Sequence, residues 1–234
     1  MSYTVTNPGK KDSYVNPLFS KPVYSTITDI DTKKILSLLG DDVEFQTDED
    51  NNYGNAILEL EDWNKQHKMF SVTSNLNILD DNKFKWLKDK LMKEFYLYAS
   101  GVLKYTNEFE ITNSWVTMSA KGQSQNFHNH SNCMYSMVLY LQSNEKSGNI
   151  IFDSMARERF ALYMEEYNII NSPQWSINPE NGMLLIFPSE VHHAVTENKS
   201  DTTRFSLAIN LLPIGELGVG SSQTGERVKI TVEK

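Results

Sequence analysis

The second half of the chain is a succession of short β-rich runs, and this texture constrains the fold more than any other feature. From Glu110 onward, segments rich in apolar and β-branched residues alternate with clusters of Gly, Asn, Ser and Pro. In the run 205–212, apolar and polar residues alternate, as they do in a strand with one side turned to a core. We predict strands at residues 111–119, 134–142, 149–153, 183–187, 193–196, 205–212 and 228–232.

Helical periodicity is confined to the first 100 residues. The spacing predicts a helix over 29–39, capped by Thr28 or Asp29 and stopped by Gly40, and a longer helix over 80–100. Helices followed by many short strands favour an antiparallel sandwich or barrel over βαβ winding. The predicted fold is mainly β: a double-stranded β-helix, or jelly roll, buttressed by helices. We expect one domain over 1–234, with 1–109 as an N-terminal support region and 110–234 as the core.

Two connections lack periodicity. Residues 41–55 are acidic and rich in turn formers, and a solvated loop is expected there because the spaced ligands and closing Glu of a calcium loop are absent. Residues 155–175 form a long connection between two predicted strands. That segment is either a surface connection without a role or a lid over a site, since long ordered connections in barrels often carry function.

Composition excludes several classes of function. The formal charge of -8 comes with no long run of Lys and Arg, so nucleic-acid binding is not expected. No apolar segment approaches the roughly 20 residues that span a bilayer, and the N-terminus lacks a secretory pattern. Cys133 is the one cysteine, so no intrachain disulfide and no cysteine-based zinc site can form. A cytoplasmic setting fits best, and the Asn- and Lys-rich composition would suit a microbe or a phage-infected host.

Four of the five histidines form two close pairs. His128 and His130 lie in the sequence FHNHSN, and His192 and His193 lie in FPSEVHHAV. Alternate residues of an extended segment share a face, so His128 and His130 can present two imidazoles to one point, and neutral imidazole is a common ligand of iron, zinc and copper. The second pair follows a turn that can return the chain antiparallel to the run 183–187. A histidine there could complete a metal site from another strand.

A candidate anion site follows the second histidine pair. Arg204 opens the run RFSLAIN, and in a strand Arg204 and Ser206 share one face. A guanidinium pairs bidentately with a carboxylate, and an unpaired Arg inside a barrel would be costly. A surface salt bridge is the ordinary alternative for Arg204, but with the histidines nearby a bound dicarboxylate accounts for it better.

The series NSWVTM, HNH with YSMVLYL and SGNIIF, NGMLLIFPSEVHHAV and TRFSLAIN resembles the 2-oxoglutarate- and Fe(II)-dependent oxygenases related to prolyl hydroxylases, a group common in bacteria and phages. The resemblance covers roughly residues 16–213. It implies a dioxygenase that uses Fe(II), 2-oxoglutarate and O2 to hydroxylate a substrate, with a protein or peptidyl side chain slightly favoured over a small metabolite.

The same resemblance implies roles for individual residues. His128 and His193 would bind the iron, Arg204 would bind the remote carboxylate of 2-oxoglutarate, and Ser206 and Tyr140 would assist it. At His130 most of the wider family has the Asp of an HxD motif. The third ligand is therefore open between His130 and the alternatives, water or Asp153, and His192 could replace His193. Three further side chains, Trp115, Met118 and Phe127, are candidates for the wall of the pocket.

Two other functions remain compatible with the sequence. One is a cupin-like enzyme with three histidine ligands that works without 2-oxoglutarate, against which the Arg204 and Ser206 pair argues. The other is a non-catalytic jelly-roll module, for binding or as part of a virion, whose histidines are incidental.

Overall fold

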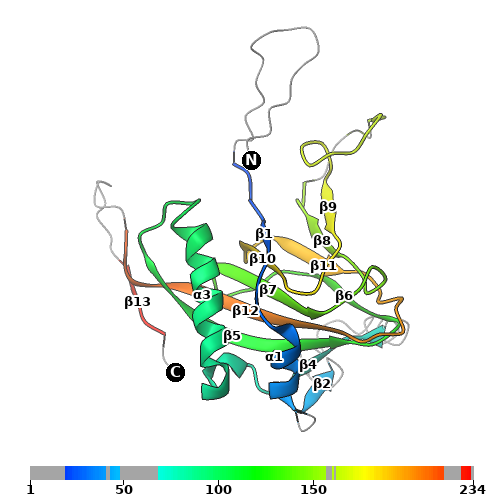
Figure 1. Ribbon diagram of the computed structural model, residues 1–234. Coiled ribbons are helices and arrows are strands. Elements are labelled where there is room, and N and C mark those ends of the chain that lie inside the picture. Colours follow the sequence, from blue (N-terminus) through cyan, green and yellow to red (C-terminus); the bar gives the residue numbers. More distant parts are fainter. Residues whose placement is uncertain are drawn as a thin grey trace, which may run out of the picture.

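Two β-sheets form the centre of the described part of the chain (Figure 1). The computed structural model describes residues 19–40, 43–47, 68–156, 160, 162–218 and 228–232. The larger sheet has eight strands in the order β1-β10-β7-β12-β5-β4-β2, with β13 paired to β12, and the smaller has five in the order β3-β6-β11-β8-β9. From β5 to β12 the chain passes repeatedly from one sheet to the other, as a jelly roll requires. The predicted double-stranded β-helix is confirmed.

The strands of the larger sheet are β1 (Tyr24–Ile27), β2 (Phe45–Thr47), β4 (Ser71–Thr73), β5 (Glu108–Ser119), β7 (Tyr135–Gln142), β10 (Met183–Pro188), β12 (Arg204–Leu217) and β13 (Val228–Ile230). Those of the smaller sheet are β3 (Lys68–Met69), β6 (Gln123–His128), β8 (Ile150–Asp153), β9 (Gln174–Ile177) and β11 (His192–Val195). All seven predicted strands are present with shifted ends. The strands β1, β2, β3, β4, β6 and β9 were not predicted.

Two helices lie across the larger sheet (Figure 1). The first, α1 (Thr32–Leu39), begins later than predicted, because the cap is Asp31, whose carboxylate accepts a hydrogen bond from the backbone N–H of Lys34 at 3.0 Å. The second, α3 (Lys85–Ala99), follows two short 3₁₀ turns, η1 (Ile78–Asp80) and η2 (Asn82–Phe84), which occupy the predicted first turn. No helix in the described part of the chain is long and apolar enough to cross a bilayer.

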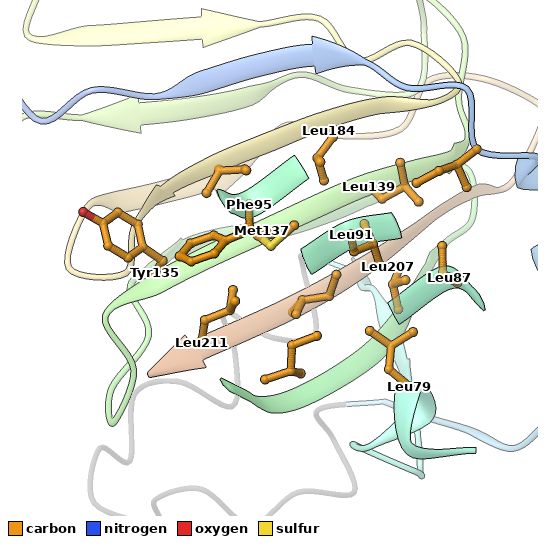
Figure 2. Close-up of a cluster of buried hydrophobic side chains, with 14 of the residues drawn as sticks. Leu79, Leu87, Leu91, Phe95, Tyr135, Met137, Leu139, Leu184, Leu207 and Leu211 are labelled. Atoms are coloured by element: carbon orange, nitrogen blue, oxygen red, sulfur yellow. The ribbon is translucent and has the colours of Figure 1, made fainter. Parts of the chain in front are cut away.

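The main core lies between α3 and the larger sheet. Figure 2 shows Leu87, Leu91 and Phe95 of α3 pointing to the odd-numbered side chains of β7 and β12, among them Met137 and Leu207. Because side chains alternate along a strand, the even-numbered residues of these strands point to the other side, between the sheets. That interior holds a second, smaller apolar cluster and the cavity described next.

The expected solvated loop over 41–55 is wrong in part. Its residues 45–47 form β2, an edge strand that pairs with β4, while 41–42 and 48–55 lie outside the described residues. The start of the family resemblance, residues 16–18, also lies outside them. The division of the chain into a support region and a core stays a prediction.

Candidate metal centre

Three imidazoles converge between the sheets. The ring centroids of His128 and His193 lie 4.2 Å apart, and those of His130 lie 5.1 Å from His128 and 5.2 Å from His193. One nitrogen from each ring lies within 4.8 Å of the others. Within the described ranges, no other group of three or more His, Cys, Asp and Glu side chains lies close enough together to share one ion.

The three histidines come from two strands and a loop. His128 ends β6 and stands directly opposite His193 of β11 in the antiparallel register. His130 lies beyond the end of β6, in a loop held by a hydrogen bond from its backbone N–H to the carbonyl of Ser189 at 3.0 Å. The convergence of His128 and His130 therefore does not come from strand alternation, as the sequence suggested, but from the loop.

The turn before His193 also differs from expectation. The strand β11 does not pair with the preceding β10; it crosses to the smaller sheet and pairs with β6 and β8. This crossing is what brings His193 opposite His128.

Hydrogen bonds orient two of the rings for metal binding. The Nδ1 atoms of His128 and His193 lie 2.8 Å and 2.9 Å from the carbonyl oxygens of Asn126 and Val191. A carbonyl only accepts, so each Nδ1 carries the hydrogen and each Nε2 keeps a lone pair. Burial lowers the pKa of His130 to about 4 and that of His193 to about 3, with smaller contributions from the neighbouring rings. Both imidazoles are thus neutral at pH 7, the form that binds metals.

A buried guanidinium lies in the same cavity. Arg204 is 2% exposed, and its NH1 donates a hydrogen bond to the carbonyl of Ser147 at 3.0 Å. Its Nε has no partner among the described residues. Burial lowers the pKa of Arg204 from its ordinary value, which reflects the cost of holding this charge away from water. A buried cation with an unused donor suits an anionic ligand.

Two hydroxyl groups accompany the guanidinium. Ser206 shares the face of β12 with Arg204, and Tyr140 of β7 is its direct partner in the register. Both side chains are buried, and both line the cavity. Burial raises the pKa of Tyr140 to about 12, although the nearby Arg204 lowers it somewhat, so the phenol keeps its hydrogen for donation.

The cavity that joins these groups has a volume of about 520 Å³ including its open mouth. The histidines, Arg204, Ser206 and Tyr140 all line it. Of the three proposed wall residues, Trp115 lines it too, with its ring centroid 5.7 Å from that of His130. Met118 and Phe127 are not among the lining residues, and Phe127 is 45% exposed.

The alternative ligands lie outside the cluster. His192 stands opposite Asp153 in the pairing of β11 with β8, one position along from His193 and Phe152. Since neighbours on a strand point to opposite faces, His192 and Asp153 point away from His193. The carboxylate of Asp153 accepts hydrogen bonds from Gln174 Nε2 at 2.8 Å and from the backbone N–H of Met155 at 2.6 Å.

A β-bulge adds a side chain that the sequence did not reveal. Between the pairs His193–His128 and Val195–Gln125, β6 advances by three residues while β11 advances by two. Gln125 and His128 therefore share a face, and the Gln125 amide nitrogen lies 3.1 Å from His128 Nε2. The sequence could have indicated Gln125 only if both β6 and its bulge had been predicted.

Two further cavity residues, Ser136 and Asn210, form a polar pair that the sequence did not lead us to expect. The hydroxyl of Ser136 donates to Oδ1 of Asn210 at 3.0 Å and lies 2.9 Å from the hydroxyl of Ser189. Asn210 follows Arg204, Ser206 and Ala208 on the same face of β12, so the two-residue period did contain the signal.

The connection between β8 and β9 does not line the cavity in the described ranges. Its residues 162–173 extend away from the two sheets in Figure 1, and residues 157–159 and 161 lie outside the described ranges. Several of its large apolar side chains are exposed, including Phe160, Leu162 and Tyr167. A lid role for this segment stays a prediction.

One protein-family model matches the part of the chain that contains this cluster. Residues 113–210 match the model of a family described as "Putative 2OG-Fe(II) oxygenase". These residues contain the three clustered histidines and Arg204. No curated protein matches the sequence.

Solved structures with a similar fold are distant in sequence. A prolyl-4-hydroxylase from Pseudomonas putida has a TM-score of 0.52 at 14% identity, over 85% of this chain and 96% of that one. The α-ketoglutarate-dependent epimerase SnoN from nogalamycin biosynthesis scores 0.57 at 9%, over 87% and 84%. HygX from Streptomyces hygroscopicus, with nickel, 2-oxoglutarate and hygromycin B bound, scores 0.55 at 9%, over 82% and 83%. The chain therefore shares its fold with these three proteins.

Proposed function

We propose that this chain, a 2-oxoglutarate- and Fe(II)-dependent oxygenase by its family match and its three-histidine cluster, hydroxylates a C–H bond of its substrate. In that reaction 2-oxoglutarate, O2 and the substrate become succinate, carbon dioxide and the hydroxylated product. One oxygen atom of O2 enters the substrate and the other enters succinate. The observation that carries the proposal is the presence, in one cavity, of three converging imidazoles and a buried Arg204 with an unused donor.

His128, His130 and His193 would hold the iron. They reach the cavity from the end of β6, from the following loop and from β11, so together they would hold the ion at the cavity wall. The aromatic rings of Phe187 and Phe152 pack near His193, at centroid distances of 4.9 Å and 6.1 Å, and limit the movement of that ring. When bound, iron and 2-oxoglutarate supply the O2 activation and oxidative decarboxylation that side chains cannot perform.

Arg204 would bind the remote carboxylate of 2-oxoglutarate. Its charge sits in a buried setting in which a charge-assisted hydrogen bond is strong, and its unpaired Nε provides the donor. Tyr140 and Ser206 would add neutral hydrogen bonds to the same group. Together they would fix the orientation of the oxoacid, so that its other end faces the histidines.

The substrate is proposed to be a protein or peptidyl side chain. One protein of similar fold is a prolyl-4-hydroxylase, which supports this class by analogy. HygX, of similar fold too, holds hygromycin B, so the same architecture also accommodates a small molecule. The peptidyl assignment therefore needs its own experiment.

The reaction is tested with isotopically labelled O2. Iron-loaded protein is incubated with 2-oxoglutarate and a peptide library, and succinate and peptides are analysed by mass spectrometry. We expect one labelled oxygen in succinate and one in a hydroxylated side chain. At a 2-oxoglutarate concentration that half-saturates the wild type, Arg204→Met should strongly reduce both signals, whereas Lys121→Met, which removes an exposed cation paired with Asp201, should keep them. Succinate without a peptide product across a broad library would contradict the peptidyl assignment alone.

A further inference from the structure

The described lining of the cavity carries a positive charge and no negative charge. Among the described residues that line it, Arg204 is the one with a permanent charge, and there is no Asp or Glu. The third position of the histidine cluster, His130, is an imidazole and not a carboxylate. The nearest candidate acid, Asp153, points to the other face of β8 and is engaged by Gln174 and Met155.

The consequence is an excess of positive charge when the site holds both Fe(II) and 2-oxoglutarate. A divalent ion contributes two positive charges, Arg204 contributes one, and the three imidazoles contribute none. The dianion 2-oxoglutarate removes two, so one positive charge remains between the sheets. A carboxylate ligand in place of His130 would have removed it. An uncompensated charge in a buried site is costly, and a bound anion would offset that cost.

Neutral hydrogen-bonding side chains also line this cavity. Ser136 engages the Oδ1 of Asn210, which leaves the NH2 group of that amide for a ligand. The amide nitrogen of Gln125 reaches to 3.1 Å from His128 Nε2, so it would lie beside a bound ion. The indole of Trp115 completes this part of the wall. Donors without a neighbouring acid suit an anionic group better than a cationic one.

From the proposed function, on which this step rests, we infer that the substrate brings an anionic group, a carboxylate in the simplest case, into the cavity between His130, Gln125 and Asn210. The group supplies the negative charge that the histidine cluster lacks. Within a peptidyl substrate, an Asp or Glu side chain or a chain-terminal carboxylate has this chemistry. A substrate that is neutral near the reacting carbon would leave the loaded site charged.

The test uses acetate and acetamide, which have nearly the same shape and differ in charge. Both are titrated without oxygen into protein saturated with Fe(II) and 2-oxoglutarate, and the visible absorption of the chelate is followed. We expect acetate to shift the absorption at concentrations at least about tenfold lower than acetamide, because a unit charge acts strongly at short range in a site of low dielectric. The absorption must persist, which shows that 2-oxoglutarate stays bound.

Two variants separate charge from shape. His130→Asp supplies the missing charge on the third ligand. Asn210→Asp supplies it in the wall without touching a ligand, and it keeps the acceptor for Ser136. Both should reduce the preference for acetate to about one. Ser25→Asp, at an exposed position of β1, adds the same charge outside the cavity and should keep the preference. Metal content is measured for each protein, so that only loaded samples are compared.

The outcomes distinguish this inference from the proposed function. Absence of the chelate absorption before any acetate is added would contradict the proposed function itself. A normal absorption with equal response to acetate and acetamide would overturn the anionic substrate, as would a preference that survives both Asp variants. An equally strong response to chloride would assign the charge to a dissolved ion and would also overturn it.

Discussion

His128 and His193 face each other across the antiparallel strands β6 and β11, with ring centroids 4.2 Å apart. Each ring is oriented by a hydrogen bond from Nδ1 to a carbonyl two residues earlier in the chain, Asn126 for His128 and Val191 for His193. The pair of strands thus works as a rigid frame that presents two Nε2 lone pairs to the same space. The function proposed for the chain depends on this frame more than on any other feature.

Removal of the Arg204 charge should weaken 2-oxoglutarate binding without lowering the thermal stability of the protein. Arg204→Met replaces a buried, incompletely paired cation with an apolar side chain, so we expect thermal stability without ligand to stay equal or to rise. The affinity for 2-oxoglutarate should fall at least about 30-fold, since losing one partner of a buried charge pair costs about 2–5 kcal/mol. Calorimetry with 2-oxoglutarate measures this. Unchanged affinity would refute the role of Arg204.

Tyr140→Phe should weaken 2-oxoglutarate binding far less than loss of Arg204. The variant keeps the buried ring and removes one neutral hydrogen bond, worth about 1 kcal/mol, so a fall of about fivefold in affinity is expected. The phenol of Tyr140 has a pKa raised to about 12, so the difference between wild type and variant should persist to about pH 10. A difference that disappears at about pH 9 would contradict donation by the phenol. Ser206→Ala removes the second hydroxyl of the site and provides the matched comparison for Tyr140→Phe.

Metal-free protein should lose stability as the pH falls from about 6.5 to about 4. Burial lowers the pKa of His130 to about 4, below the ordinary 6.5 of an unfolded chain. Between these values the unfolded state binds a proton that the folded state does not, so the free energy of unfolding decreases toward acid. The contribution of His130 is about 2 kcal/mol at most, because the side chain is only partly buried.

Urea unfolding at several pH values measures this effect. His130→Gln should show a smaller loss of stability between pH 6.5 and about pH 4 than the wild type. Gln125→Ala, which alters the same cavity without removing a titratable group, should keep the wild-type slope. Parallel curves for wild type and His130→Gln would contradict the lowered pKa.

Gly148 links a backbone requirement to the cosubstrate site. It has φ of +86°, and a Cβ there would collide with the carbonyl oxygen of Thr196. The preceding carbonyl, of Ser147, accepts the hydrogen bond from Arg204. We expect Gly148→Ala to destabilise the protein by about 2–4 kcal/mol and to weaken 2-oxoglutarate binding as Arg204 loses its support.

Gly40→Ala provides the control for the backbone strain. Gly40 has φ of +77°, but a Cβ there would have nothing within 4 Å. It should cost about 1 kcal/mol and leave the affinity for 2-oxoglutarate unchanged. Equal effects of the two substitutions on stability and affinity would show that the contact with Thr196 has no consequence.

The strands that the sequence predicted well are those with regular apolar patterns. In β7, β10 and β12 the two faces are buried against helix α3 and against the barrel interior, which produces nearly continuous apolar runs. The strand β6 has the sequence QSQNFH and no apolar pattern, because one face borders the polar cavity and much of the other is exposed. Such a strand exists because of its partners β11 and β3, which a local pattern does not contain.

The same physical reason explains which residues of the candidate site the sequence predicted and which it did not. Arg204 and Ser206 were placed on one face by the two-residue period of a regular strand, and the structure has them there. Gln125 could not be found in this way, because the bulge in β6 breaks the period. His130 was expected in the cluster through strand alternation, but it reaches the cluster from a loop fixed by Ser189. Loop geometry of this kind depends on contacts between distant segments.

The most direct test of the proposed chemistry is an anaerobic titration with Fe(II) followed by 2-oxoglutarate, observed by visible absorption. We predict a charge-transfer band that appears only when both are present and saturates at one 2-oxoglutarate per chain. It should be absent in His128→Ala and His193→Ala. Protein that binds iron stoichiometrically but develops no band with excess 2-oxoglutarate would contradict the assignment of this cavity.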